Sequence, residues 1–191
     1  MDKQSAFRVL DGEAPLLAEL SNQIWDLAEV GFQEHESSRV LAERRKREGV
    51  QLACGLGGIE TAFHAGWGTG GPRSALLGEF EALPGMSQQA GVATPAPIPE
   101  THSAHGCGHH LLGTASAAAA IAVKHWLEAN HMPGTIEFYG CPAEENGSGK
   151  ALMAKAGGFE GLDATLTWHP SCFNFVLSAS MLANYKIRYA F

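Results

Sequence analysis

The sequence predicts an α/β domain built on a mixed, mostly parallel sheet, and two observations support this prediction. Three apolar or β-prone runs of strand length occur at residues 74–78, 135–140 and 164–168. Helical patterns separate them, since a long Ala-rich stretch lies between the first two runs and a shorter stretch between the last two. Strands that alternate with helices in this way favour parallel pairing in one sheet.

The first part of the chain predicts two helices and two short strands. Residues 13–30 carry leucines, an isoleucine and alanine at helical spacing, with Asp11 near the start and Gly31 after the end. The elements predicted next, in chain order, are a helix at 37–48, strands at 50–53 and 61–65, and a turn at 66–72.

The later part predicts a long helix at residues 109–129 and a shorter one at 148–156, which two glycines close. Residues 182–191 have an imperfect strand pattern, and neither a turn nor a partner strand follows them. Such a strand is either paired at a sheet edge or cut, and we favour a cut. The chain is therefore expected to be the front portion of a longer protein.

Composition excludes several classes of protein. The 191 residues, 45% of them hydrophobic, can form one domain with a core. A net charge of −7 disfavours nucleic acid, because phosphate binding needs a basic surface. The small apolar run at 115–123 is too short to span a bilayer, and the N-terminus lacks a signal-peptide core. With four widely spaced cysteines, these features predict a cytoplasmic protein without a membrane partner.

Acidic and histidine side chains follow each of the three predicted parallel strands. Glu79 and Glu81 follow the first strand, Glu144 and Glu145 the second, and His169 the third. In open α/β sheets, sites form outside the carboxyl ends of the strands. We therefore expect these side chains to converge at one edge of the sheet.

The stretch THSAHGCGHH places four histidines and a cysteine at the start of the long predicted helix. Cys107 and His109 are separated by one glycine, so both can point the same way. A helix N-terminus and a cation both lower the pKa of a thiol, which favours metal ligation over a buried free cysteine. His102, His105 and His110 are expected to support the ligands through hydrogen bonds or to lie on the loop surface.

The carboxylates suggest a division of roles. Glu144 and Glu145 point to opposite sides if extended, so one can bind a metal ion while the other faces the substrate as a general base. The alternative is a surface acidic pair at a helix start, where acids are favoured anyway. Glu79 or Glu81 can accept a hydrogen bond from a ligand histidine, or lie in a solvated turn. His169, an ordinary structural histidine by itself, becomes a candidate ligand in this company.

Five motifs, in order and spacing, resemble the metal-dependent amidohydrolase branch of the M20 peptidase family. They are GFQEHESS, ALLGEFEALPGMSQ, HGCGHHLLGTASAAAAIA, GTIEFYGCPAEENGSGK and ATLTWHP. The resemblance implies a three-layer, zinc-peptidase-like catalytic domain, of which residues 1–180 form the N-terminal part. It also implies two divalent ions, zinc or manganese. Residues 181–191 would be the first strand of an α+β lid through which the full-length protein forms a homodimer or heterodimer.

The resemblance also implies a role for each site residue. Cys107 would bridge the two ions, with His109, Glu145 and His169 as further ligands. Glu144 would be the general base that activates the bridging water. The reaction implied is hydrolysis of the amide bond in a small N-acyl amino acid, such as an aminobenzoyl-glutamate.

The chain departs from the family pattern at three points. Glu79 and Glu81 stand where aspartates are usual, and His110 stands where Asn or Asp is common. The family's final histidine ligand comes from a far C-terminal part that these residues do not contain, so four of five expected ligands are present. We therefore expect this fragment alone to be inactive.

Two other functions remain open from the sequence. A catalytically inert metal-binding module, or a truncated subunit, would keep the ligands without turnover. A cysteine-nucleophile amidase would use Cys107 and a histidine. It is disfavoured because it gives no use for Glu144, Glu145 and His169, and metal-dependent amide hydrolysis is the leading hypothesis.

Overall fold

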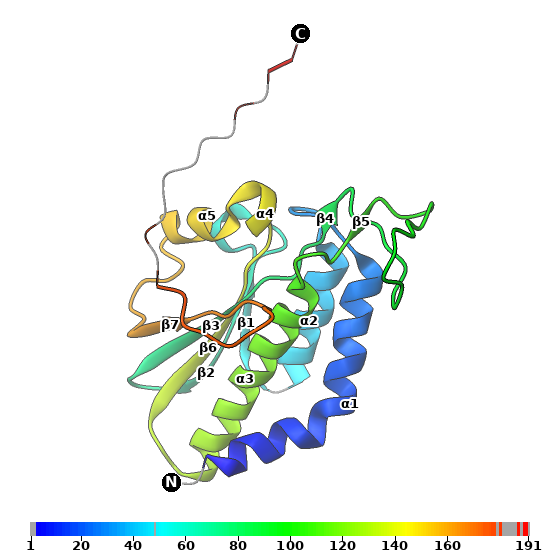
Figure 1. Cartoon of the computed structure of the whole chain (residues 1–191). Coiled ribbons are helices and arrows are strands. Elements are labelled where there is room, and N and C mark those ends of the chain that lie inside the picture. The colour runs from blue at the N-terminus through cyan, green and yellow to red at the C-terminus, as the bar shows by residue number, and fades with distance from the viewer. Residues whose placement is uncertain (1–2, 48, 179, 181–186, 188, 191) are drawn as a thin grey trace.

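A five-stranded sheet forms the centre of the computed structural model, which describes residues 3–47, 49–178, 180, 187, 189 and 190. The strand order is β1-β2-β6-β3-β7 (Figure 1). The strands are β1 (Gln51–Cys54), β2 (Phe63–Thr69), β3 (Arg73–Gly78), β6 (Gly134–Gly140) and β7 (Ala164–Leu166). A separate two-stranded ladder pairs β4 (Leu83–Pro84) with β5 (Ser103–Ala104).

Helices cover both faces of this sheet and complete three layers. Their bounds are α1 (Gln4–Leu27), α2 (His35–Arg47), the 3-10 helix η1 (Leu56–Gly58), α3 (His109–Ala129), α4 (Glu144–Gly147) and α5 (Gly149–Lys155). The helices α1, α2 and α3 pack on one face, whereas η1 and α5 pack on the other (Figure 1). The predicted α/β class is confirmed.

The sheet is mixed, and most of its strands point the same way. Strand β3 runs parallel to β6 and β7. Strand β2 is antiparallel to both β6 and β1, so β1 has the direction of β6. Within the described sheet, only β2 runs against the other strands, which confirms the mostly parallel arrangement.

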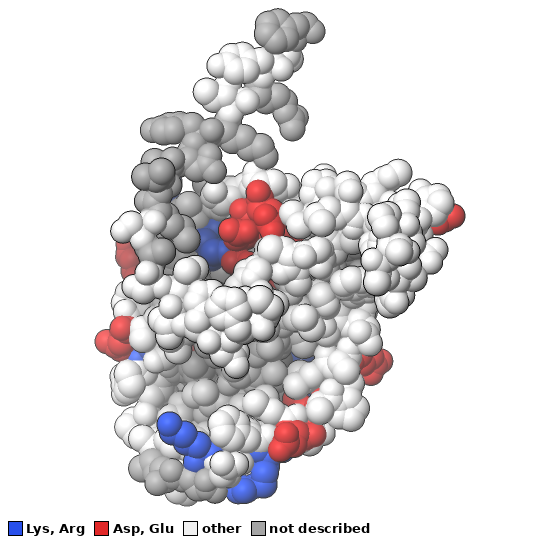
Figure 2. Space-filling model, in the orientation of Figure 1, with Lys and Arg blue, Asp and Glu red and all other residues white. Residues whose placement is uncertain are grey.

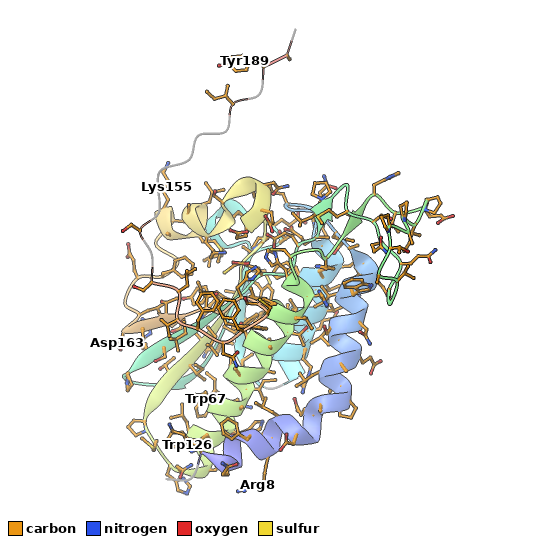
Figure 3. All side chains as sticks on the ribbon, in the orientation of Figure 1. Arg8, Trp67, Trp126, Lys155, Asp163 and Tyr189 are labelled. Carbon is orange, nitrogen blue, oxygen red and sulfur yellow. The ribbon has the colours of Figure 1, made fainter. Side chains whose placement is uncertain are left out.

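Alternation along the central strand β6 divides the core into two parts. Ile136 and Phe138 pack against the helices α1 to α3, and Tyr139 packs against Met153 of α5 on the opposite face. Successive side chains of a strand point to opposite faces, so one strand supplies both cores. Trp67 and Trp126 border the first core at the end away from α4 (Figure 3).

Three predicted boundaries were wrong. Helix α1 begins at Gln4, well before residue 13. This early start was missed because the first turns of the helix bury few side chains and carry no apolar stripe. Strand β2 continues to Thr69 through the glycines that were assigned to a turn, because those residues pair with β6. The short helix α4 begins at Glu144, before the helix start predicted at residue 148, so Glu144 and Glu145 are helical and not extended.

The strand predicted for residues 182–191 lies largely outside the described part of the chain. The same holds for the lid expected to begin at residue 181, so this domain boundary stays a prediction. Among the described residues, none of the helices combines the length and the apolar character that crossing a membrane requires.

Two glycines bring α3 against the carboxyl end of β3. A Cβ atom on Gly78 would lie 3.1 Å from the Cα atom of Gly113 in α3, and one on Gly113 would lie 2.6 Å from the carbonyl oxygen of Glu79. Larger residues would therefore push the helix away from the strand. The close approach places His109, the first residue of α3, beside Glu79.

Candidate metal centre

Side chains from separate segments meet where β3 and β6 end. Glu79 and Glu81 follow β3, Glu144 and Glu145 begin α4 shortly after β6, and His109 begins α3. Figure 2 shows an acidic patch in the region of α4, with basic atoms against it. The structure thus brings together the groups that the strand-end argument expected to converge.

A thiol and two imidazoles form the first group of possible metal ligands. Sγ of Cys107 lies 3.2 Å from Nε2 of His169. The rings of His169 and His109 meet edge to face, with centroids 5.6 Å apart. One donor atom of each of the three residues lies within 4.8 Å of the others. Thiolate sulfur and imidazole nitrogen are donors that zinc prefers.

His109 faces carboxylates with both ring nitrogens. Nε2 lies 3.0 Å from Oε2 of Glu79 and 3.9 Å from Oε1 of Glu145, while Nδ1 lies 3.4 Å from Oε2 of Glu81. The residue is 1% exposed, and neither nitrogen makes an aligned hydrogen bond within the described residues. Glu79, His109 and Glu144 form a second group of possible ligands. Because buried polar atoms rarely stay unpartnered, this donor set fits divalent cations.

Glu81 connects the imidazole to the start of α4. Its Oε1 accepts the backbone N–H groups of Glu144, at 2.5 Å, and Glu145, at 3.1 Å. Its Oε2 accepts the N–H of Phe80 at 3.3 Å. Burial works to raise the pKa of Glu81, but His109 and the backbone N–H groups hold it below the ordinary value. Glu81 therefore stays ionised, and its support of a ligand histidine stays a prediction.

Glu79 has a cationic partner that the sequence analysis missed. Lys150, in α5, donates to Oε1 of Glu79. The other oxygen of Glu79 faces His109. The two residues are 71 positions apart in the chain, so no local pattern in the motif containing Lys150 could have indicated the pair.

The thiol of Cys107 is protonated in the absence of a cation. Burial, together with Glu145, Glu144 and Glu79, raises the pKa of Cys107 to about 12. The sequence analysis expected a helix N-terminus and a cation to lower this pKa; without a cation, burial and the surrounding carboxylates raise it instead. A thiol that keeps its proton is a poor nucleophile, which disfavours a cysteine amidase.

Glu144 has the electrostatic surroundings of a proton acceptor. Burial and the charges of Glu79, Glu145 and Glu81 raise the pKa of Glu144 above its ordinary value, against an opposing effect of Lys150. A carboxylate with a raised pKa binds a proton more readily near neutral pH. This is the property that the predicted general base requires.

His105 and His110 contact α1 beside the ligand cluster. Nε2 of His105 lies 2.9 Å from the carbonyl oxygen of Ile24, and the His110 ring meets Trp25 edge-on at 4.9 Å. Burial and the neighbouring histidines lower the pKa of His110 to about 4, so it is neutral at pH 7. Burial lowers the pKa of His105, and the charge of His109 and the backbone of Glu81 also affect it, so this ring lies close to the cluster. Both histidines pack the loop onto α1, and their supporting role stays a prediction.

Glu34 is a further residue of the site that the sequence analysis did not single out. It is fully buried, and its oxygens accept the N–H of Ala143 at 2.8 Å and the hydroxyl of Thr61 at 3.1 Å. Ala143 has a φ of 56°, a left-handed conformation that costs about 1–2 kcal/mol for a residue with a side chain. Glu34 thus holds the strained residue that precedes Glu144.

Glu34 is expected to make the stability of the protein fall as pH rises. Burial and the charge of Glu81 raise the pKa of Glu34, although the N–H of Ala143 opposes the shift. Between the ordinary and the raised pKa the folded state binds more protons than the unfolded state, so stability decreases with pH. Glu34→Gln keeps the hydrogen-bonding shape and should lose this contribution. Urea unfolding with EDTA between about pH 4 and pH 8 measures it.

The control for this prediction is Glu34→Ala. It leaves the buried N–H of Ala143 unsatisfied, which should cost about 1–3 kcal/mol throughout the pH range. Identical pH profiles for the wild type and Glu34→Gln would show that Glu34 titrates normally and would contradict the prediction.

Residues 75–187 match the peptidase family M20/M25/M40, and the chain belongs to this family. Curated relatives agree with this assignment. Over 192 residues the chain is 44% identical to a p-aminobenzoyl-glutamate hydrolase subunit of Escherichia coli (strain K12), covering 98% of this chain and 40% of that protein. Over 181 residues it is 32% identical to an Xaa-Arg dipeptidase of Mus musculus, and the match covers 88% of this chain and 38% of that protein.

Solved structures share the fold. A dinuclear metal-binding peptidase of the M20 family from Bacillus subtilis matches with a TM-score of 0.63 and 23% identity, covering 83% of this chain and 44% of that one. An aminobenzoyl-glutamate utilization protein from Klebsiella pneumoniae matches with a TM-score of 0.60 and 19% identity. This match covers 84% of this chain and 45% of that one. The chain spans about two fifths of the length of the curated relatives it matches.

Proposed function

We propose that this chain is part of a metal-dependent amidohydrolase that cleaves the amide bond of a small N-acyl amino acid. The observation that supports this most is the meeting of a thiol, two imidazoles and four carboxylates where β3 and β6 end. Membership of the M20/M25/M40 family supports the same reaction class. The name of the bacterial relative makes p-aminobenzoyl-glutamate the first substrate to test.

We assign two divalent ions to the centre. Cys107, His109, Glu145 and His169 would hold them, with Cys107 shared between the two. Bound ions would polarise the carbonyl of the scissile amide and lower the pKa of the attacking water. Thiolate and imidazole suit zinc and carboxylates accept manganese, so both metals fit this donor set.

The chain's own residues would position and move the proton. Glu144 accepts a proton from the attacking water and returns it to the leaving amine. Its main chain is fixed, because Glu81 accepts its N–H and Glu34 accepts that of Ala143. A base held by its backbone presents its carboxylate from a defined direction, which favours a productive approach.

We also propose that turnover needs residues outside these 191. The centre contains four of the five ligands that the family resemblance implies, and the curated relatives are more than twice as long as the chain. For the complete protein we propose a homodimer or heterodimer formed through a lid domain. The bacterial relative is named as one subunit of a hydrolase, which supports an assembly.

The 191-residue chain is expected to bind Zn²⁺ or Mn²⁺ but to release no p-aminobenzoate from p-aminobenzoyl-glutamate. The complete protein is expected to hydrolyse this substrate, to lose activity on treatment with a chelator and to regain it when metal is restored. Chromatography of the released p-aminobenzoate measures hydrolysis by the 191-residue chain and by the complete protein. Turnover by the 191 residues alone would show that they suffice, and chelator-resistant turnover would remove metal from the proposed function.

A further inference from the structure

His109 presents a different nitrogen to each of two buried glutamates. Glu81 lies on the Nδ1 side and Glu79 on the Nε2 side. Both oxygens of Glu81 already accept backbone N–H groups, so this carboxylate is engaged by the protein. Nε2 is therefore the nitrogen of His109 that remains for a cation.

The two carboxylate oxygens of Glu79 have different neighbours, since one contacts a lysine and the other faces the metal centre. Lys150 holds its Oε1, and its Oε2 lies 3.0 Å from Nε2 of His109. Glu79 is 6% exposed, and donor atoms of Glu79, His109 and Glu144 lie within 4.8 Å of one another. A buried carboxylate oxygen that faces a buried imidazole nitrogen needs a proton or a cation between them, because two lone pairs would otherwise meet.

We propose that Glu79 is itself a metal ligand, contributing Oε2 to the ion that His109 binds through Nε2. This inference rests on the proposed function, and it gives Glu79 a direct part where the sequence suggested only support for a histidine. Lys150 keeps Oε1 and offsets one negative charge in a centre that also contains Glu144 and Glu145. Neutralisation of this kind lowers the cost of burying several carboxylates together.

An ion pair between Glu79 and a protonated His109 brings the same atoms together without metal. The two arrangements differ once a cation is bound, because a ligand oxygen contacts the ion and a mere partner does not. Glu81 provides the matched comparison, since it faces the other nitrogen of the same ring. Removal of a group that only orients a ligand typically costs 10–100-fold in metal affinity.

The test is the visible absorption spectrum of Co²⁺ bound to the 191-residue chain, because these bands depend on the number and type of ligands. Glu79→Gln is expected to change the spectrum and to weaken Co²⁺ binding by at least about 100-fold, above the range for an orienting group. Glu79→Asp, which retains the charge but shortens the reach, is expected to change the spectrum too. Glu81→Gln is expected to keep the wild-type spectrum and to lose about 10–100-fold in affinity.

Glu60→Gln is the control for the amide substitution, because the Glu60 side chain is 86% exposed, and it should match the wild type. Circular dichroism of each variant checks that the fold is retained. A wild-type Co²⁺ spectrum in both Glu79 variants overturns the inference and leaves the proposed function standing. Failure of the wild-type chain to bind Co²⁺ overturns the inference, whereas the proposed function is overturned by chelator-resistant turnover of the complete protein.

Discussion

Replacement of Glu144 by glutamine is expected to lower turnover by the complete enzyme about 10²–10⁴-fold, the range of general base catalysis, while leaving its metal content unchanged. The amide keeps the shape of the side chain but cannot accept the proton of the attacking water. The backbone N–H of residue 144 still reaches Glu81, so the position of the side chain should persist. Steady-state kinetics with p-aminobenzoyl-glutamate and elemental analysis of the purified variant measure the two quantities.

Comparison with Glu145→Gln distinguishes the proposed general base, Glu144, from the proposed metal ligand, Glu145. Oε1 of Glu145 lies 3.9 Å from Nε2 of His109, on the side of the ring that faces the proposed ions. Glu145→Gln should therefore lower both metal content and turnover. Loss of metal from Glu144→Gln, with metal retained by Glu145→Gln, would reverse the roles assigned to the two glutamates.

Cys107→Ser is expected to weaken zinc binding by at least about 100-fold, which exceeds the usual effect of losing a group that only orients a ligand. The substitution removes the sulfur that lies 3.2 Å from His169 and leaves a hydroxyl, which is a much weaker zinc donor. Competition with a chromophoric chelator measures the affinity. Because Cys107 is only partly buried and lies in a turn before α3, the fold of the metal-free chain should be unaffected.

Cys172→Ser and Cys54→Ser are the controls for this substitution, since both cysteines are exposed and neither belongs to a group of possible ligands among the described residues. Both should bind zinc as the wild type does. Equal zinc affinity for Cys107→Ser and the two controls would contradict the assignment of Cys107 as a ligand.

The sequence predicted the parallel part of the fold because its signals are local and strong. The helix predicted at residues 109–129 coincides with α3, whose Ala-rich pattern is long enough to be unambiguous. The extension of β2 was missed, because pairing with β6 outweighs the turn preference of its glycines. The pairing partner lies about 70 residues away and leaves no trace in the local composition.

The candidate site divides in the same way. The strand-end rule indicated which acids would meet His109, because it depends only on where each strand stops. Lys150 and Glu34 were missed, since the contacts that connect them to the site are with segments 71 and 109 residues away. The metal roles of Cys107, His109, Glu145 and His169 stay predictions.

Glu34 and Glu81 both affect how readily a metal ion binds to the centre. Both anchor the main chain at the start of α4 using protein groups alone. An arriving cation thus meets a scaffold that is already assembled, and little of its binding free energy is spent on ordering the loop. Substitution of Glu34 or Glu81 should therefore affect the order of this loop in the metal-free protein more than it affects catalysis by the metal-bound protein.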